Sequence, residues 1–216
     1  MEKGDMVLVD YIGKADGEIF DLTVEEKAQE EGMSRGKDFK PAPVLIGKNY
    51  VIEGFEEALL DMEVGDQKEA EISSEKAYGE RDSDAVKTYP EKEFKKQGIQ
   101  VRTGEELKIG NRRGKVVSKG SGRVRIDFNH PLAGKDLKYD IRVKEKVEDD
   151  EEIAKHIMDY RIGHGSEDME FEGEKVKVPG MYSHEDHEHE LPEEAREKLT
   201  KEMTEYTGFE EVEFTK

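Results

Sequence analysis

Apolar and polar residues alternate along several short stretches of the chain, a pattern typical of strands that are buried on one face. The clearest case is 136–147, where Leu137, Tyr139, Ile141 and Val143 fall on the same side of an extended backbone. A Gly-Ser-Gly turn and an Asp-Gly pair each separate two such runs and favour hairpins. Further strands are predicted at 6–11, 18–20, 67–73, 114–128 (two strands), 175–178 and 210–214.

Other segments carry the spacing or the end signals of helices. Within 53–62 apolar residues recur every three or four positions, which places them on one helical face. Pro90 is placed to begin a short helix that Gly98 ends, and Pro192 to begin a later one. Helical turns are also predicted at 24–32 and 150–160. Short helices and strands in mixed order predict an α+β fold.

Composition and charge divide this chain into modules. Of its 216 residues 33% are hydrophobic and 41% charged, which favours several small cores over one large core. The formal net charge is -19, but residues 84–128 carry a net +6 and residues 148–216 a net -15. A basic block inside an acidic chain predicts a separate module with partners of its own. The overall acidity argues against nucleic-acid binding by the whole protein.

The chain contains no cysteine, which excludes disulfides, thiolate metal sites and cysteine nucleophiles. Its first residues, MEKGDMVLVDY, lack the apolar run of a signal peptide. No stretch approaches the roughly 18 apolar residues of a membrane span. The sequence therefore predicts a cytoplasmic protein without membrane contact.

Three segments in the first part of the chain carry distinctive motifs. They are GEIFDLT, then VLIGKNYVIEGFEEALLDMEVGD, then AYG. In this order they resemble the FKBP-type peptidyl-prolyl cis/trans isomerases, and the Val-Ile-x-Gly-Phe-Glu-x-Ala-Leu stretch is the most specific part. The residues that carry the resemblance are Phe20, Asp21, Val51, Ile52, Gly54, Phe55 and Tyr78.

About 50 residues follow Gly79 before the pattern resumes in NHPLAGKDLKYDIRV. That arrangement is similar to the SlyD-like members, in which the intervening segment is an insert-in-flap chaperone domain. The acidic C-terminal region resembles the extra domain of long archaeal FKBPs. The resemblance implies an isomerase domain at 1–83 and 129–147, an inserted small β-rich domain at 84–128, and a C-terminal α+β domain at 148–216.

The family fold is a curved antiparallel β-sheet wrapped on a short helix, with the substrate proline between the two. The resemblance makes Phe55 the floor of that pocket and puts Asp21 at its rim. The hydroxyl of Tyr78 suits the substrate carbonyl. The expected site residues are Tyr11, Phe20, Asp21, Val51, Ile52, Phe55, Tyr78, Leu132 and Tyr139. Taken singly, each apolar or aromatic member is more typical of a core residue than of a site residue, and it is their joint occurrence in family order that favours a site.

Prolyl isomerisation needs no covalent chemistry. An X-Pro bond rotates over a barrier of about 18–20 kcal/mol that amide resonance sets. A dry aromatic pocket favours the twisted amide, which has lost conjugation and part of its charge separation. No cofactor is therefore required.

The resemblance implies unfolded or nascent polypeptides with X-Pro bonds as substrates, and FKBP-type macrolides as ligands. The inserted domain is expected to bind unfolded chains. Two alternatives stay open: a holdase chaperone with weak isomerase activity, and an accessory factor whose basic insert contacts the ribosome. A merely solvated basic face is the simplest interpretation of that insert. The C-terminal domain is expected to dimerise or to bind partners.

The segment SHEDHEHE holds three histidines among carboxylates. His184, His187 and His189 are candidate ligands for a weakly bound divalent metal such as Ni or Zn. The segment is polar and expected to be mobile, which favours a weak adventitious site or no metal site over a specific one.

Overall fold

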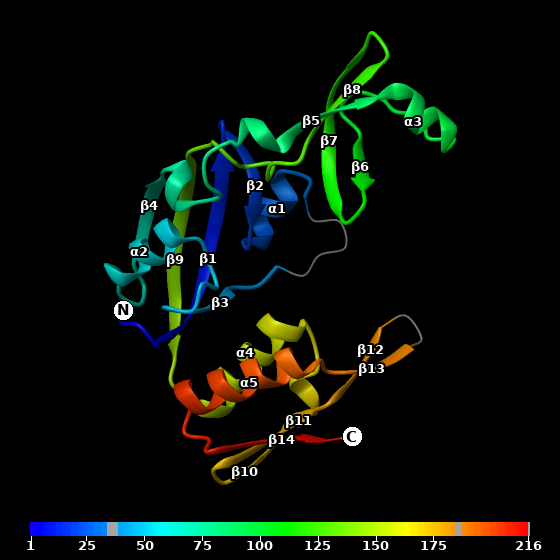
Figure 1. Ribbon diagram of the computed structural model, residues 1–216. Helices are drawn as coiled ribbons and strands as arrows, with labels where there is room; N and C mark the ends of the chain where they lie inside the picture. Colours follow the sequence, from blue (N-terminus) through cyan, green and yellow to red (C-terminus); the bar gives the residue numbers. More distant parts are fainter. Residues whose placement is uncertain (34–38, 185–186, 216) are drawn as a thin grey trace. The chain divides into compact units, whose positions relative to one another are not determined.

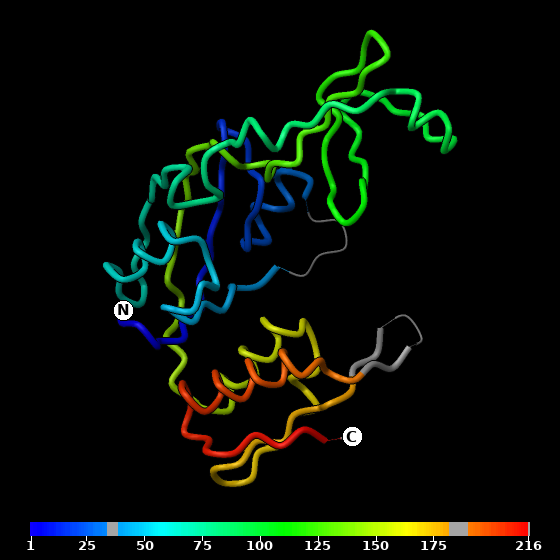
Figure 2. Tube along the Cα trace, in the orientation of Figure 1, coloured from blue at the N-terminus to red at the C-terminus, as the bar shows by residue number. Residues whose placement is uncertain are grey.

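The computed structural model describes residues 1–33, 39–184 and 187–215, with the side chains of 182–189 left out of the description. The chain forms two compact units, whose parts can be followed by colour along the chain (Figures 1 and 2). The first unit comprises Met1–Gly13, Ile19–Ala70 and Tyr139–Lys216. The second comprises Lys14–Glu18 and Glu71–Lys138.

A five-stranded sheet and two short helices form the first part of the fold. Its strands run in the order β2-β1-β9-β4, and β3 pairs with β1 in antiparallel register (Figure 1). The elements are β1 (Met6–Ala15), β2 (Glu18–Leu22), α1 (Glu25–Glu30), β3 (Ala42–Leu45), α2 (Glu53–Leu60), β4 (Gln67–Ile72) and β9 (Leu137–Val147). The alternating side chains of β9 that the sequence placed on one face are all buried. The expected α+β sheet and helix are confirmed.

Helix α2 packs against this sheet through its apolar face. Phe55, Ala58 and Leu59 of the helix are buried, as the three-to-four spacing predicts. Glu53 and Glu56 lie in the first turn, where the helix dipole favours negative charge. The Glu56 carboxylate also accepts a hydrogen bond of 2.9 Å from the backbone N–H of Gly47.

The second unit contains a separate four-stranded antiparallel sheet with the order β5-β8-β7-β6. Its core consists of Phe94, Val101, Val116, Val124 and Ile126. The elements are η1 (Ser74–Lys76), η2 (Ser83–Ala85), β5 (Val86–Pro90), α3 (Glu91–Lys96), β6 (Glu106–Ile109), β7 (Arg112–Gly120) and β8 (Arg123–Asp127). The predicted hairpin of β7 and β8 is confirmed.

Helix α3 has the ends that the sequence predicts. Pro90 precedes its first residue as the N-cap, and Gly98 follows it with a φ of +71°. Phe94 is the residue of the helix that is buried, and its ring meets that of Tyr89 edge to face at 6.1 Å. The helix therefore covers the core side of the four-stranded sheet.

The C-terminal part of the first unit places helices beside a small sheet. Helices α4 and α5 lie side by side (Figure 1). The sheet has the order β10-β11-β14, and β11 pairs with β14 in parallel because α5 crosses between them. The elements are α4 (Asp150–Ile162), η3 (Ser166–Asp168), β10 (Glu170–Glu172), β11 (Lys175–Pro179), β12 (Met181–His184), β13 (His187–Glu190), α5 (Glu193–Tyr206) and β14 (Glu211–Thr215).

Helix α4 begins and ends at residues with the matching chemistry. The Asp149 side chain accepts a hydrogen bond of 3.0 Å from the Glu152 N–H and so caps the first turn. Gly163 ends the helix in the left-handed region at a φ of +93°. Within the described ranges, no helix combines the length and the apolar character that crossing a membrane requires.

The histidine segment differs from its sequence-based interpretation, which assigned no strand to it. Strands β12 and β13 pair in antiparallel register, with His184 opposite His187 and Tyr182 opposite His189. Hydrogen bonds between backbones do not depend on side-chain polarity, so a hydropathy pattern does not reveal such a hairpin.

A partly buried polar contact, with Glu202 as its most buried member, joins helices α4 and α5 to the loop before α2. The rings of Tyr50 and Tyr160 stack at 3.6 Å with an angle of 10° between them. Arg161 binds both carboxylate oxygens of Glu202, and the Tyr50 hydroxyl lies 3.3 Å from the same carboxylate. Burial, followed by the charge of Glu202, raises the pKa of the Tyr50 hydroxyl far above its usual value. Outside this cluster, Lys48 pairs with Glu205 at 3.2 Å.

Replacing Arg161 with methionine is expected to lower the free energy of unfolding by roughly 2–4 kcal/mol. The reason is that Glu202, only 7% exposed, would keep its charge without a cation. Urea unfolding measures the effect. The matched control is Lys198→Met, which breaks the exposed pair with Glu194 and should cost less than about 1 kcal/mol. Equal losses of unfolding free energy in the two variants would show that the Arg161–Glu202 pair contributes no more than an exposed ion pair.

Candidate functional site

Four aromatic rings meet where helix α2 faces the sheet. Phe55 and Tyr139 are both buried, and their rings meet edge to face with centroids 5.0 Å apart. Tyr11 contacts Phe55 at 5.6 Å and Tyr139 at 5.8 Å, and Phe20 contacts Tyr139 at 5.8 Å. Tyr11 and Phe20 are half-buried, so the cluster forms an aromatic surface that is partly open to solvent.

The sheet order explains why these rings meet. Phe20, Tyr11 and Tyr139 come from β2, β1 and β9, which are successive neighbours in the sheet. Phe55 is the third residue of α2 and adds the fourth ring from the helix side. Residues up to 128 positions apart in the sequence thereby form one cluster of rings.

Gly13 belongs to this cluster, although the sequence analysis did not select it. A Cβ atom at this position would lie 2.8 Å from Tyr139 Cε1 and 2.9 Å from Phe20 Cζ. Both distances are shorter than side chains tolerate, so glycine is what lets the two rings close over the strand. The available signal was a glycine inside an otherwise regular strand pattern, which often marks a close approach.

Asp21 holds the hydroxyl of Tyr11. The Tyr11 hydroxyl donates a hydrogen bond of 2.7 Å to Asp21 Oδ2, while Asp21 Oδ1 accepts one of 3.0 Å from the Leu22 N–H. The strand is fixed a second time where the Tyr11 N–H donates to Thr23 Oγ1 at 2.8 Å. Because Asp21 itself is exposed, this pair lies at the solvent edge of the cluster.

Val51 and Ile52 lie in the segment that leads into α2. Both are half-buried. Ile52 is the N-cap of the helix in an extended conformation, and its carbonyl accepts hydrogen bonds from the N–H groups of Phe55 and Glu56. Tyr50, which stacks on Tyr160, directly precedes them. The segment is therefore fixed at both ends, by the helix start and by the aromatic stack.

Tyr78 and Leu132 belong to the second unit, where both approach the same histidine. The rings of Tyr78 and His130 stack at 4.0 Å with an angle of 8°. The Leu132 N–H donates a hydrogen bond of 3.2 Å to His130 Nδ1. The Asn-His-Pro-Leu-Ala-Gly motif thus builds a turn that carries the histidine against Tyr78.

The side chains of His184, His187 and His189 lie outside the described residues, so the metal prediction stays a prediction. Among the residues whose side chains are described, no group of three or more His, Asp or Glu is placed to hold a metal ion.

Comparison with known proteins assigns the family. Residues 1–100 match the model of the FKBP-type peptidyl-prolyl cis-trans isomerases, and residues 87–132 match that of the FKBP26 IF domain. A short-type peptidyl-prolyl cis-trans isomerase of Methanocaldococcus jannaschii is 36% identical over 146 residues, which cover 67% of this chain and 93% of that protein. This chain is an FKBP-type peptidyl-prolyl cis-trans isomerase.

Two bacterial relatives agree with this assignment. The isomerase is 29% identical over 144 residues to SlyD of Helicobacter pylori, covering 62% of this chain and 77% of that one. It is also 29% identical over 152 residues to an FKBP-type 16 kDa isomerase of Escherichia coli, covering 67% and 93%. The SlyD-like resemblance inferred from the motifs is confirmed.

Gly13→Ala is expected to lower both stability and isomerase activity. The added methyl group would push apart the rings of Phe20 and Tyr139, costing about 1–3 kcal/mol of unfolding free energy. We expect kcat/KM on a proline peptide to fall at least about tenfold, because the ring positions shift. The control is Gly120→Ala, whose added Cβ would meet nothing within 4 Å. Full activity in the Gly13→Ala enzyme would argue against a closely packed cluster.

Proposed function

We propose that this isomerase turns over X-Pro bonds in unfolded and nascent polypeptides, using the aromatic cluster as the surface on which the proline ring packs. The observation that carries this proposal is the meeting of Tyr11, Phe20, Phe55 and Tyr139 at one place, partly open to solvent. Such a surface offers an apolar ring a dry environment and offers the planar amide no compensating hydrogen bonds.

The physical basis is preferential binding of the twisted amide. The barrier of about 18–20 kcal/mol arises from conjugation, which the twisted state has lost. An apolar surface penalises the charge-separated planar amide more than the twisted one, and so lowers the barrier. Each reduction of about 1.4 kcal/mol accelerates the rotation tenfold.

We assign separate roles to the residues around the cluster. Phe55 and Tyr139 form its floor, and Asp21 accepts the hydrogen bond of the Tyr11 hydroxyl and so holds the Tyr11 ring at the solvent edge of the cluster. Val51 and Ile52 supply apolar walls from the segment before α2. The roles of Tyr78 and Leu132 rest on the family resemblance alone.

We also propose that the inserted β-rich module, 84–128, binds unfolded chains and raises their effective concentration at the isomerase site. The match of residues 87–132 to the FKBP26 IF domain supports this role. Exposed apolar side chains, with Ile99 38% and Val117 36% exposed, support it as well.

The remaining partners follow from the sequence arguments alone. They are FKBP-type macrolide ligands, a second copy of the chain bound through 148–216, and the ribosome. The absence of cysteine supports a cytoplasmic site of action.

A proline-limited refolding reaction tests the main proposal. Catalytic amounts of the wild-type protein should accelerate it, and Tyr11→Phe should lower kcat/KM by about five- to tenfold because one hydrogen bond at the site is lost. Tyr206→Phe, which removes a hydroxyl bonded to Glu205 instead, serves as the control. No acceleration by folded wild-type protein would refute the proposed turnover.

Replacing 84–128 with a short glycine-serine loop separates the two activities. Catalysis on short proline peptides should remain within about twofold of wild type, because the aromatic cluster lies outside the replaced segment. Catalysis of whole-protein refolding should fall at least about tenfold, since the gain in effective concentration is lost. A loop variant that refolds proteins as fast as the parent would contradict the chaperone role.

A further inference from the structure

One face of the four-stranded sheet in the second unit carries a group of basic side chains. In the strand register Arg125 lies opposite Ser118 and Thr88, and Arg113 lies opposite Lys108. Directly paired residues point to the same face of a sheet. The face opposite the core therefore carries what we name the basic face: Lys108, Arg113, Lys115, Arg123 and Arg125.

The other face of the same sheet is buried. Val116, Val124 and Ile126 are at most 1% exposed and form the core together with Phe94 of α3. The five residues of the basic face are all exposed. Helix α3 thus covers one face of the sheet, while the basic face is presented to solvent.

The cations of the basic face have no ion-pair partner among the residues that the structure describes. The cations of the C-terminal sheet, in contrast, are paired: Lys175 and Lys177 each form ion pairs with two glutamates on neighbouring strands. On the basic face Lys115 lies across from Glu106 and Asp127 without forming an ion pair within the described residues. Lys108 lies directly across from Arg113. Like charges placed directly across from each other destabilise a sheet, and an anionic ligand would relieve that repulsion.

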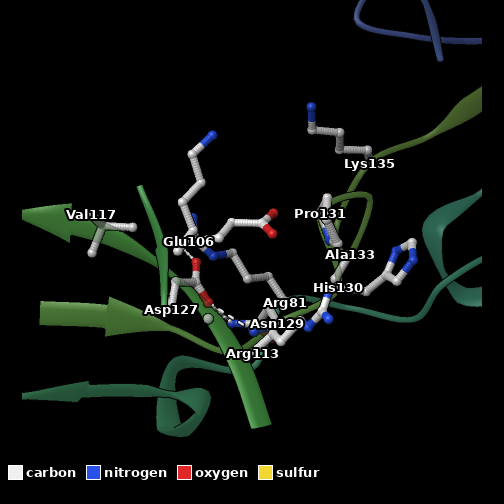
Figure 3. Close-up of a pocket in the computed structure, with 12 residues that line it drawn as sticks. Arg81, Glu106, Arg113, Val117, Asp127, Asn129, His130, Pro131, Ala133 and Lys135 are labelled. Carbon is white, nitrogen blue, oxygen red and sulfur yellow. Dashed lines mark hydrogen bonds and ion pairs between the residues drawn. The ribbon is translucent and has the colours of Figure 1, made fainter. Parts of the chain in front are cut away.

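A cavity of about 430 Å³ adjoins this face. Figure 3 shows Asp127 beside Arg81 and Asn129, with Val117 on one side and His130 and Lys135 on the other. Lys115, Arg113 and Glu106 line it from the sheet, and Pro131 and Ala133 from the segment after the sheet.

Two acidic residues line this cavity, Glu106 and Asp127, and Asp127 is paired with Arg81. Burial acts to raise the pKa of Asp127, but hydrogen bonds from Asn129 and Arg81 outweigh it and hold that pKa below its usual value. Lys135 is likewise engaged, by Asp16 at 2.8 Å. Arg113 and Lys115 form no ion pair within the described residues, although Lys115 lies across from Glu106, and both remain available to a ligand.

We propose that the basic face and its cavity bind acidic segments of unfolded polypeptide chains. Carboxylates spaced along an extended peptide match cations that stand on alternate strand positions. Val117, Pro131 and Ala133 offer apolar contacts to the side chains between them. The inference rests on the proposed binding of unfolded chains by the insert, and it adds the class of segment that is selected.

A polypeptide fits this surface better than RNA. Single-stranded nucleic acids bind sheets largely by stacking bases on aromatic rings. The aromatic residues of this sheet, Tyr89 and Phe128, pack with Phe94 on the core side.

Fluorescence anisotropy with the full-length protein tests the proposal. The probes are three proline-free unfolded peptides of equal apolar content that carry four Glu, four Gln or four Lys. At low salt the wild type should bind the Glu peptide at least about tenfold more tightly than the Gln peptide, and added salt should remove the preference. R113E/K115E should abolish it. K92E/K96E, which makes the same charge change on α3, should retain it.

Each other outcome has a distinct meaning. Equal binding of the three peptides by wild type would overturn the charge selection and leave the binding of unfolded chains intact. Binding of no peptide would overturn both. The RNA control is an oligouridylate that binds wild type more tightly than the Glu peptide does and loses that binding in R113E/K115E. That result would replace the polypeptide with RNA as the ligand. If R113E/K115E does not fold by circular dichroism, R113Q/K115Q should still lower the preference at least about threefold, and an unchanged preference would overturn the proposal.

Discussion

The edge-to-face contact between Phe55 and Tyr139, with centroids 5.0 Å apart, joins helix α2 to the sheet at the centre of the aromatic cluster. Rings at this distance attract one another beyond the area they bury. Tyr11 and Phe20 are placed by their contacts with this pair, and Gly13 leaves them the space to do so. The proposed catalytic surface is therefore an extension of the core, which is why each of its members, taken singly, resembles a core residue.

The C-terminal part of the first unit contributes to the segment that leads into the site. Tyr160 stacks on Tyr50, and Arg161 and Glu202 close a buried polar contact around that ring. Val51 and Ile52 follow immediately in the chain. A region without family motifs of its own thus helps to fix two residues of the proposed pocket, and a buried ion pair gives that contact a defined geometry.

The two proposed activities use surfaces of different charge. The proposed isomerase surface consists of aromatic rings, which suits a rotation without covalent chemistry. The insert carries a net +6 in a chain of net -19, and its cations gather on the sheet face away from the core. Weak, salt-sensitive contacts of this kind favour rapid capture and release of chains, which suits an enzyme that must return each substrate.

The sequence by itself determined two things. Its motifs carried the family resemblance and, with it, the candidate residues Phe55 and Tyr139, while periodicity and end signals, which are local, predicted the α+β class and the positions of α2, α3 and β9. Tertiary structure decided what depends on pairing between distant strands. The place of Gly13 between two rings, the hairpin of β12 and β13, and the gathering of Arg113, Lys115 and Arg125 on one face follow from strand register. Register is set by contacts between segments far apart in the chain, which no local pattern contains.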